Sequence, residues 1–236
     1  MTVVEDLDAA LLGAKAIPQV NLGSVDEAYA VQALLVQRRI DRGEKMVGVK
    51  MGLTSKAKMA QVGVDQVIWG RLTDAMRVPD GGTVSLEGFI HPRIEPEVAF
   101  LVRDGAIAAV APALEIIDSR YADFKFTLPD VIADNTSAAA FVVGAWSPMP
   151  SNVDNLGVLL EVDGAVVQAG STAAILGDPR RAFEQGAAMA GELKDGWVFL
   201  AGAATAAVPL ERGAFVRAVV EGLGMASVKA VGSWGS

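Results

Sequence analysis

The sequence contains no cysteine and only one histidine, His91, and each shortage excludes a class of chemistry. Without cysteine, the chain has no disulfides, no thiolate nucleophile, no iron–sulfur cluster and no cysteine-bound zinc. With one histidine, it cannot form a metal site with two histidine ligands from the same chain. Any bound metal must therefore take mainly oxygen ligands, which favours Mg²⁺ or Mn²⁺ over Ca²⁺.

Long apolar runs and clusters of positive charge are also missing. Hydrophobic residues make up 52% of the chain, yet they are spread in short runs, well below the ~20 residues of a membrane helix. The first residues lack the basic region and apolar core of a signal peptide, so we expect a cytoplasmic protein. A net charge of −8, with no basic cluster that interleaves aromatic residues, argues against nucleic acid as a partner.

The apolar pattern predicts an α+β fold in one continuous unit, with a helical N-terminal segment over 1–46 and a β-rich, rolled or barrel-like domain over 47–236. Periodicity and capping residues predict helices at 3–14, 24–42 and 178–193, and one helical turn at 56–61. Asp163-Gly164 is a strong hairpin-turn signal. Short apolar runs predict strands at 47–53, 67–71, 83–88, 94–102, 112–118, 139–145, 157–162, 165–169, 197–202, 214–220 and 226–231.

Three glutamates interrupt runs that otherwise read as buried strands. Glu95 and Glu97 are two residues apart in the strand predicted at 94–102, so they point to the same face. Glu115 lies in a second apolar run. Taken singly, such an acid is usually an edge residue that faces solvent, but three buried carboxylates cost several kcal/mol each unless a cation neutralises them. Together they can supply three oxygen ligands to Mg²⁺, with the remaining positions left for water or substrate.

Other polar residues are candidates for substrate contacts. Lys50 is a lone cation at a glycine-marked strand end, where it would contact an anionic substrate or move a proton, or else extend along the surface. His91 is either a substrate contact or a structural hydrogen-bonding residue. Thr205 ends a predicted strand and would face the site, or else is an ordinary strand threonine.

The segment 118–137 is polar and aromatic, too irregular for a strand, and typical of a lid or binding loop. Within it, Lys125 between two phenylalanines would close on the substrate, and Asn135 and Ser137 would donate hydrogen bonds. The alternative for each of these residues is turn chemistry.

Several stretches are similar to a known family. They are 48–55 (GVKMGLTS), 68–76 (IWGRLTDAM), 91–97 (HPRIEPE), 114–121 (LEIIDSRY) and 133–137 (ADNTS). In these stretches the chain resembles the 4-oxalocrotonate decarboxylases of catechol meta-cleavage pathways, close relatives of the 2-hydroxypenta-2,4-dienoate hydratases. Both groups belong to the fumarylacetoacetate hydrolase superfamily. The resemblance covers most of the chain and is most specific between residues 47 and 145.

The resemblance implies a mixed β-roll core, and Mg²⁺ or Mn²⁺ held by Glu95, Glu97 and Glu115. It implies that Lys50 and Asp74 lie in the active site, although Asp74 by itself reads as a turn residue, and that Leu53 contacts the substrate. We further expect Arg120 and Lys125 to steer a dianionic substrate.

The implied activity is decarboxylation of 4-oxalocrotonate, a 2-oxo dicarboxylate, in aromatic catabolism. The first alternative is hydration of 2-hydroxypenta-2,4-dienoate, which needs the same metal and the same site. Hydrolysis of an acylpyruvate and a catalytically silent, metal-stabilised partner role are further alternatives. A homo-oligomer and a complex with the pathway hydratase are the expected assemblies. A glycosidase is disfavoured, since neighbouring acids on one strand cannot flank a sugar bond.

Overall fold

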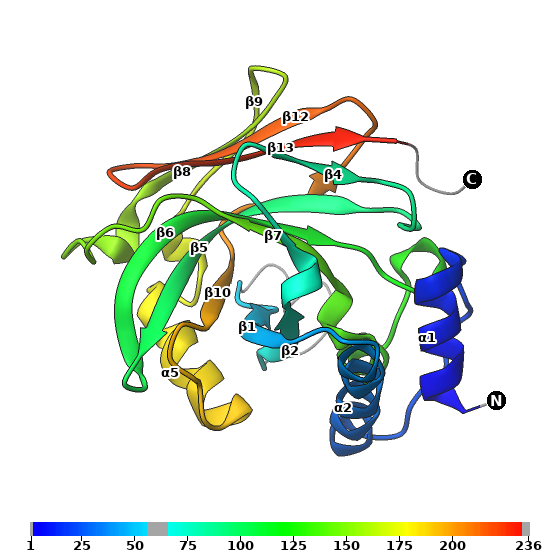
Figure 1. The fold of residues 1–236 in the computed structure, drawn as a ribbon. Helices are drawn as coiled ribbons and strands as arrows, with labels where there is room; N and C mark the ends of the chain where they lie inside the picture. Colours follow the sequence, from blue (N-terminus) through cyan, green and yellow to red (C-terminus); the bar gives the residue numbers. More distant parts are fainter. Residues whose placement is uncertain (1, 56–65, 233–236) are drawn as a thin grey trace.

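Two stacked β-sheets form the core of the molecule, which we describe from a computed structural model over residues 2–55 and 66–232 (Figure 1). The larger sheet is curled and mixes parallel and antiparallel pairs. Its order is β2 (Ile68–Thr73), β1 (Met46–Gly52), β10 (Val198–Ala203), β5 (Arg93–Arg103), β6 (Ala106–Ile117), β7 (Ala138–Val143) and β3 (Arg77–Val78), with β11 (Val208–Pro209) paired to β5. The smaller sheet has the order β4 (Gly82–Ser85), β13 (Gly224–Val231), β12 (Phe215–Val220), β8 (Gly157–Val162) and β9 (Ala165–Ser171).

An apolar layer joins the two sheets. From the larger sheet come Ile94, Leu114, Ile116 and Val142, and from the smaller sheet Leu160, Val216, Ala218, Ala226 and Val228, all buried. Strand residues alternate between faces, so the same strands turn their other side chains away from this layer. The large hairpin of β5 and β6 therefore presents its second face to the rest of the molecule.

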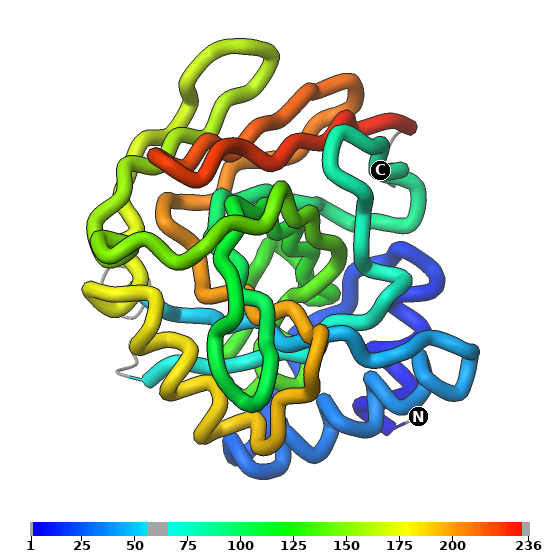
Figure 2. Tube along the Cα trace, turned by 60° about the vertical axis from the view of Figure 1, so that its left-hand side comes forward, coloured from blue at the N-terminus to red at the C-terminus, as the bar shows by residue number. Residues whose placement is uncertain are grey.

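Helices cover the larger sheet on the side away from the smaller one (Figures 1 and 2). The helices α1 (Val3–Gly13), α2 (Val25–Asp41) and α4 (Leu128–Ala133) share an apolar cluster with Ile68 of β2. α5 (Pro179–Ala190) packs Phe183 against Phe199 of β10, with ring centroids 5.0 Å apart. Short 3₁₀ turns are η1 (Asp74–Met76), η2 (Ala122–Phe124), η3 (Asn135–Ser137), η4 (Val153–Asn155) and η5 (Thr172–Ala174). None of the described helices is long and apolar enough to cross a bilayer.

The predicted α+β fold with a rolled sheet is confirmed, and most predicted elements are found within a few residues of their expected bounds. Asp163 and Gly164 adopt positive φ angles of 50° and 85° in the β8–β9 hairpin, as the turn signal predicts. The irregular loop expected over 118–137 is a wrong prediction in part, because α4 forms inside it. The helical turn predicted at 56–61 lies outside the described residues.

Candidate active site

Three buried carboxylates meet on the inner face of the β5–β6 hairpin. Glu95 lies directly opposite Glu115 in the register of the two strands, and Glu97 follows two residues later on the same face. Ligand oxygens of the three residues lie within 4.8 Å of one another. These residues are 4%, 0% and 0% exposed, so solvent cannot compensate their charges. The predicted clustering of the three acids is therefore found in the structure.

The electrostatics of this cluster favour a cation. Glu97 Oε2 accepts a hydrogen bond from the Gly202 N–H at 2.9 Å, but its Oε1 and Glu115 Oε2 have no hydrogen-bond donor. Burial raises the pKa of Glu97 well above its usual range, and the carboxylates of Glu115 and Glu95 raise it further against the opposing effect of Lys50. Burial also raises the pKa of Glu115, against the effect of Lys50. Unsatisfied carboxylate oxygens that converge on one point are the donor set of a hard divalent cation.

Lys50 places a cation beside this cluster. It lies on β1, is 2% exposed, and holds its Nζ 3.0 Å from Glu115 Oε1. The same Nζ donates a hydrogen bond to the Thr136 carbonyl at 3.0 Å. Two fixed acceptors thus hold the ammonium group, and the alternative of a lysine extended along the surface is wrong.

A strained turn supplies the second acceptor. Asn135, Thr136 and Ser137 have consecutive positive φ angles of 50°, 55° and 56°, a conformation that costs about 1–2 kcal/mol for each residue with a side chain. The Asn135 side chain supports it by accepting from the Arg71 N–H at 2.8 Å and donating to the Arg71 carbonyl at 2.9 Å. The turn points the Thr136 carbonyl at Lys50 and places the buried Ser137 Oγ, which has no hydrogen-bond partner, at the cavity.

Close backbone approach at the cluster requires glycine at position 202. Gly202 has φ +113°, and a Cβ there would lie 2.1 Å from Thr54 Oγ1. Its N–H is the donor that orients Glu97. A side chain at this position would disturb both the strand end and the carboxylate.

A cavity of about 550 Å³ opens beside the cluster. Lys50 and Glu95 reach it, and most of its remaining wall is apolar. Its other lining residues are Gly52, Leu53, Ser55, Ile68, Arg93, Ile117, Phe124, Phe126, Val131, Thr136, Ser137, Ala174, Ala203, Ala204, Thr205, Ala206 and Ala207. Of the predicted substrate-binding residues, Leu53, Ser137 and Thr205 are therefore at the cavity. Such a pocket, with few polar groups at one end, fits a small ligand with an anionic head.

Asp74 is not brought to this cavity, which corrects the expectation that it lies in the active site. It begins η1, is exposed, and its Oδ1 accepts from the Lys45 and Ala75 backbone N–H groups at 2.9 and 3.0 Å. Lys50 pairs with Gly70 on β2, and Asp74 is four residues further along, about 13 Å at the usual rise of a strand. Asp74 caps a turn, as its local sequence alone suggests.

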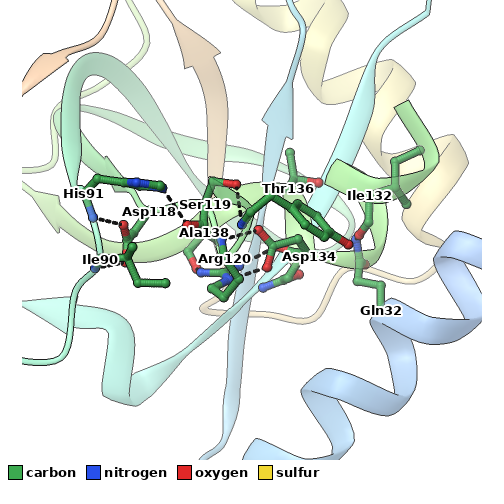
Figure 3. A network of polar contacts seen from close by, with 12 residues as sticks. Gln32, Ile90, His91, Asp118, Ser119, Arg120, Ile132, Asp134, Thr136 and Ala138 are labelled. Atoms are coloured by element: carbon green, nitrogen blue, oxygen red, sulfur yellow. Dashed lines mark hydrogen bonds and ion pairs between the residues drawn. The ribbon is translucent and has the colours of Figure 1, made fainter. Parts of the chain in front are cut away.

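Arg120 and His91 are also held elsewhere, in the polar network of Figure 3, and neither lines the cavity. The Arg120 guanidinium forms a buried ion pair with Asp134, and its other nitrogens reach the Asp134 and Ala138 carbonyls. Burial raises the pKa of Asp134 to about 6, against the effect of Arg120. His91 Nε2 lies 2.8 Å from the Ser119 carbonyl oxygen, and the His91 N–H donates to Asp118. The predicted substrate contacts of both residues are not found.

Asn135 and Lys125, which were also predicted to bind the substrate, do not line the cavity either. Both polar groups of the Asn135 side chain are bound to Arg71, and the residue is not among those that line the cavity. The Lys125 side chain is 74% exposed and lies 3.5 Å from Asp123, outside the cavity. Its neighbours Phe124, at the end of η2, and Phe126 line the wall instead.

Arg93 is a charged residue of the cavity wall that was not predicted from the sequence. It lies on β5 two residues before Glu95, and therefore on the same face of the strand. The alternation that picks out Glu95 and Glu97 extends to Arg93, so the signal was present in the sequence.

No protein-family model matches the chain. It is 48% identical to the 4-oxalocrotonate decarboxylase of a Pseudomonas species, over 98% of this chain and 97% of that protein. The chain belongs to the 4-oxalocrotonate decarboxylase family. The resemblance stated from the sequence is thus confirmed.

Solved structures of the family agree with the fold. The 4-oxalocrotonate decarboxylase of Pseudomonas putida G7, complexed with magnesium and adipate, superposes with a TM-score of 0.90 at 37% identity, over 97% of this chain and 95% of that one. Fumarylpyruvate hydrolase from Pseudomonas aeruginosa has a TM-score of 0.61 at 16% identity, over 80% of this chain and 90% of that one, which shows a shared fold. The family also has hydratase relatives: 2-hydroxyhexa-2,4-dienoate hydratase of Comamonas testosteroni is 34% identical, over 87% of this chain and 86% of that protein.

Proposed function

We propose that this protein decarboxylates 4-oxalocrotonate (2-oxohex-3-enedioate) to 2-hydroxypenta-2,4-dienoate, in aromatic meta-cleavage catabolism. The observation that carries the proposal is the convergence of three buried carboxylates beside Lys50 at the end of an apolar cavity, with oxygens of Glu97 and Glu115 that lack a hydrogen-bond donor. Glu95, Glu97 and Glu115 would hold Mg²⁺ or Mn²⁺, and the related enzyme of Pseudomonas putida G7 is complexed with magnesium. The six-carbon adipate in that complex has the length of the proposed substrate.

The reaction breaks the bond between C5 and C6 of the substrate and releases C6 as CO₂. The electron pair of that bond forms a C4–C5 double bond, the C3–C4 pair moves to C2–C3, and the C2 carbonyl pair moves onto its oxygen. The bound divalent cation would supply Lewis-acid stabilisation for the negative charge on that oxygen. Protonation of the oxygen gives the dienol product.

Side chains at the cavity would stabilise the negative charge that develops in this reaction. Lys50, fixed by Glu115 and the Thr136 carbonyl, would place its ammonium group beside the enolate oxygen, stabilise its charge and donate a proton to it. The Ser137 hydroxyl has its hydrogen-bonding capacity free for the substrate's carboxylate end. The apolar walls formed by Ile68, Phe124 and Phe126 would limit contact between a bound substrate and water, which strengthens these interactions.

The test is CO₂ release from 4-oxalocrotonate by the pure protein, with Mg²⁺ and with a chelator. We expect release with Mg²⁺ and its loss with chelator. The Glu97→Gln variant, with one ligand oxygen replaced by an amide, should lose at least 100-fold in activity at low Mg²⁺, equivalent to about 2.7 kcal/mol. The exposed Glu211→Gln variant serves as the matched control and should keep wild-type activity. Full activity of Glu97→Gln at low Mg²⁺ would contradict the ligand assignment.

Hydration of 2-hydroxypenta-2,4-dienoate is the second candidate, because the chain also has hydratase relatives and the same site would serve. Turnover of the dienol without CO₂ release from 4-oxalocrotonate would favour the hydratase, and binding without turnover would favour a silent partner. A homo-oligomer, a complex with the pathway hydratase and a cytoplasmic location stay predictions. Size-exclusion chromatography with and without the hydratase tests both assemblies.

A further inference from the structure

Arg93 places a second cation on the cavity wall. Its Nη2 donates a hydrogen bond to the Ala207 carbonyl at 2.8 Å, and its guanidinium carbon lies 5.9 Å from the centre of the Phe124 ring. These contacts fix the group, yet no carboxylate among the described residues pairs with it. A partly buried guanidinium with donors left over is suited to a carboxylate ligand.

The other arginine and lysine residues that were candidates for binding a substrate carboxylate are engaged elsewhere. Arg120 is fully engaged with Asp134 and backbone carbonyls, and Lys125 is outside the cavity. Lys50 is held against Glu115 at the acid cluster. Within residues 2–55 and 66–232, Arg93 is thus the cation that faces the cavity away from Lys50.

The spacing along β5 matches the length of the substrate. Two residues of a strand cover about 7 Å, so the Cα atoms of Arg93 and Glu95, which both line the cavity, lie about that far apart along β5. Three bonds of an extended backbone span about 3.3–3.6 Å, so the five carbon–carbon bonds of a six-carbon diacid span about 6 Å. A diacid with one end at the acid cluster is therefore long enough to place its other end beside Arg93.

We propose that Arg93 binds the distal carboxylate of the substrate, the group that leaves as CO₂, and thereby selects dicarboxylates over monocarboxylates. The inference rests on the proposed function and names the residue that recognises the far end of the substrate. Phe124 and the Ala207 carbonyl hold the guanidinium in place, so that binding costs little side-chain entropy.

The chemistry of the leaving group predicts how Arg93 acts on the kinetics. The distal carboxylate carries a full charge in the bound substrate and loses it as neutral CO₂ forms. Its contact with Arg93 is therefore stronger in the ground state than in the transition state. Removing the guanidinium should raise KM for 4-oxalocrotonate without lowering kcat.

The decisive experiment compares two inert ligands that differ only at the far end. 2-Oxoadipate and 2-oxohexanoate share the 2-oxo acid head, and only the first has a distal carboxylate. Their dissociation constants are measured by calorimetry with Mg²⁺ for the wild type, Arg93→Met, Arg93→Lys and the control Arg103→Met. Arg103 is an exposed arginine at the far end of the same strand.

We expect the wild type and Arg103→Met to prefer 2-oxoadipate by about 10- to 100-fold, the range of a charge-assisted hydrogen bond. Arg93→Met should abolish this preference while its affinity for 2-oxohexanoate stays unchanged, and Arg93→Lys should keep part of it. The assignment would be overturned if Arg93→Met still preferred 2-oxoadipate, or if it lost affinity for both ligands equally. Because ligand binding needs no turnover, this result is independent of whether CO₂ is released from 4-oxalocrotonate, which tests the proposed function.

Discussion

At the scale of single residues, Glu97 connects charge, stability and ligand binding. It is fully buried, one of its oxygens has no donor, and its pKa is raised above the ordinary value of 4.5. The folded, metal-free protein therefore binds a proton at Glu97 that the unfolded chain has already released. The free energy of unfolding then falls as pH rises from about 4.5 through the raised pKa of Glu97.

Removing the charge of Glu97 should have an unusual effect on the stability of the metal-free protein. Without metal at pH 7.5, Glu97→Gln should be more stable than the wild type, because the amide carries no charge to desolvate and can still accept from Gly202. A gain of about 1 kcal/mol would raise Tm by roughly 2–4 °C. Mg²⁺ should raise Tm of the wild type but not of the variant.

Calorimetric scans at pH 5 and pH 7.5, with and without Mg²⁺, check this prediction. The difference between the two proteins in the absence of metal should be smaller at pH 5 than at pH 7.5, because a larger fraction of Glu97 in the folded wild type is protonated at the lower pH. A lower Tm of the metal-free variant at pH 7.5 would mean that the carboxylate is stabilising without a cation.

The sequence predicts the acidic ligands well at this scale, since a carboxylate inside an apolar strand is a strong signal. It fails at Asp74 and Arg120, whose partners are Lys45, Ala75 and Asp134. A polar residue in a matching motif is equally able to cap a turn or to contact a ligand. Only the three-dimensional course of β2 and α4 decides between the two.

At the scale of secondary-structure elements, the left-handed turn of η3 positions the lysine. Three successive non-glycine residues with positive φ persist because the Asn135 side chain hydrogen-bonds to both backbone groups of Arg71. This turn also fixes the position of the Thr136 carbonyl, which accepts a hydrogen bond from Lys50.

Asn135→Ala is expected to lower the free energy of unfolding by about 2–4 kcal/mol, through two lost hydrogen bonds and a turn without support. It should also reduce kcat by about tenfold, because Lys50 loses a fixed acceptor. Denaturant unfolding and steady-state kinetics measure the two effects. Asn152→Ala, at an exposed asparagine with no side-chain cap bond, should change neither.

Elements with a local signature were predicted closely. The capping residues behind the predicted helices are found: Ser24 and Asp178 begin α2 and α5, and their side chains accept from the backbone N–H groups of Glu27 and Arg180. The missed helix α4 carries a capping box of Thr127 and Asp130, so its signal was available within the polar segment. The left-handed turn that follows had no such signal, because tertiary hydrogen bonds to β2 create it.

At the scale of the whole molecule, strand order brings the site together. β10 lies between β1 and β5, parallel to the first and antiparallel to the second. This order places the Gly202 N–H against Glu97, 105 residues earlier in the chain. Local sequence patterns specify strands but not their neighbours, so the contact between Gly202 and Glu97 was not predicted from the sequence.

The net charge of −8 predicts a salt effect on catalysis. A dianionic substrate approaches a molecule of the same sign, so screening should help association. We expect kcat/KM for 4-oxalocrotonate to rise as NaCl is increased from about 10 to 150 mM at saturating Mg²⁺, over which the Debye length falls from about 30 to 8 Å. Steady-state assays across this range measure it, and a monotonic fall would indicate local steering by cations.

The five-stranded sheet contributes no side chain to the cavity wall described above. Its task is mechanical support, through the apolar layer that backs the acid-bearing hairpin. The outward side of that sheet is thus separated from the reacting atoms by this apolar layer, and it offers an engineer a place for dyes, linkers or immobilisation chemistry.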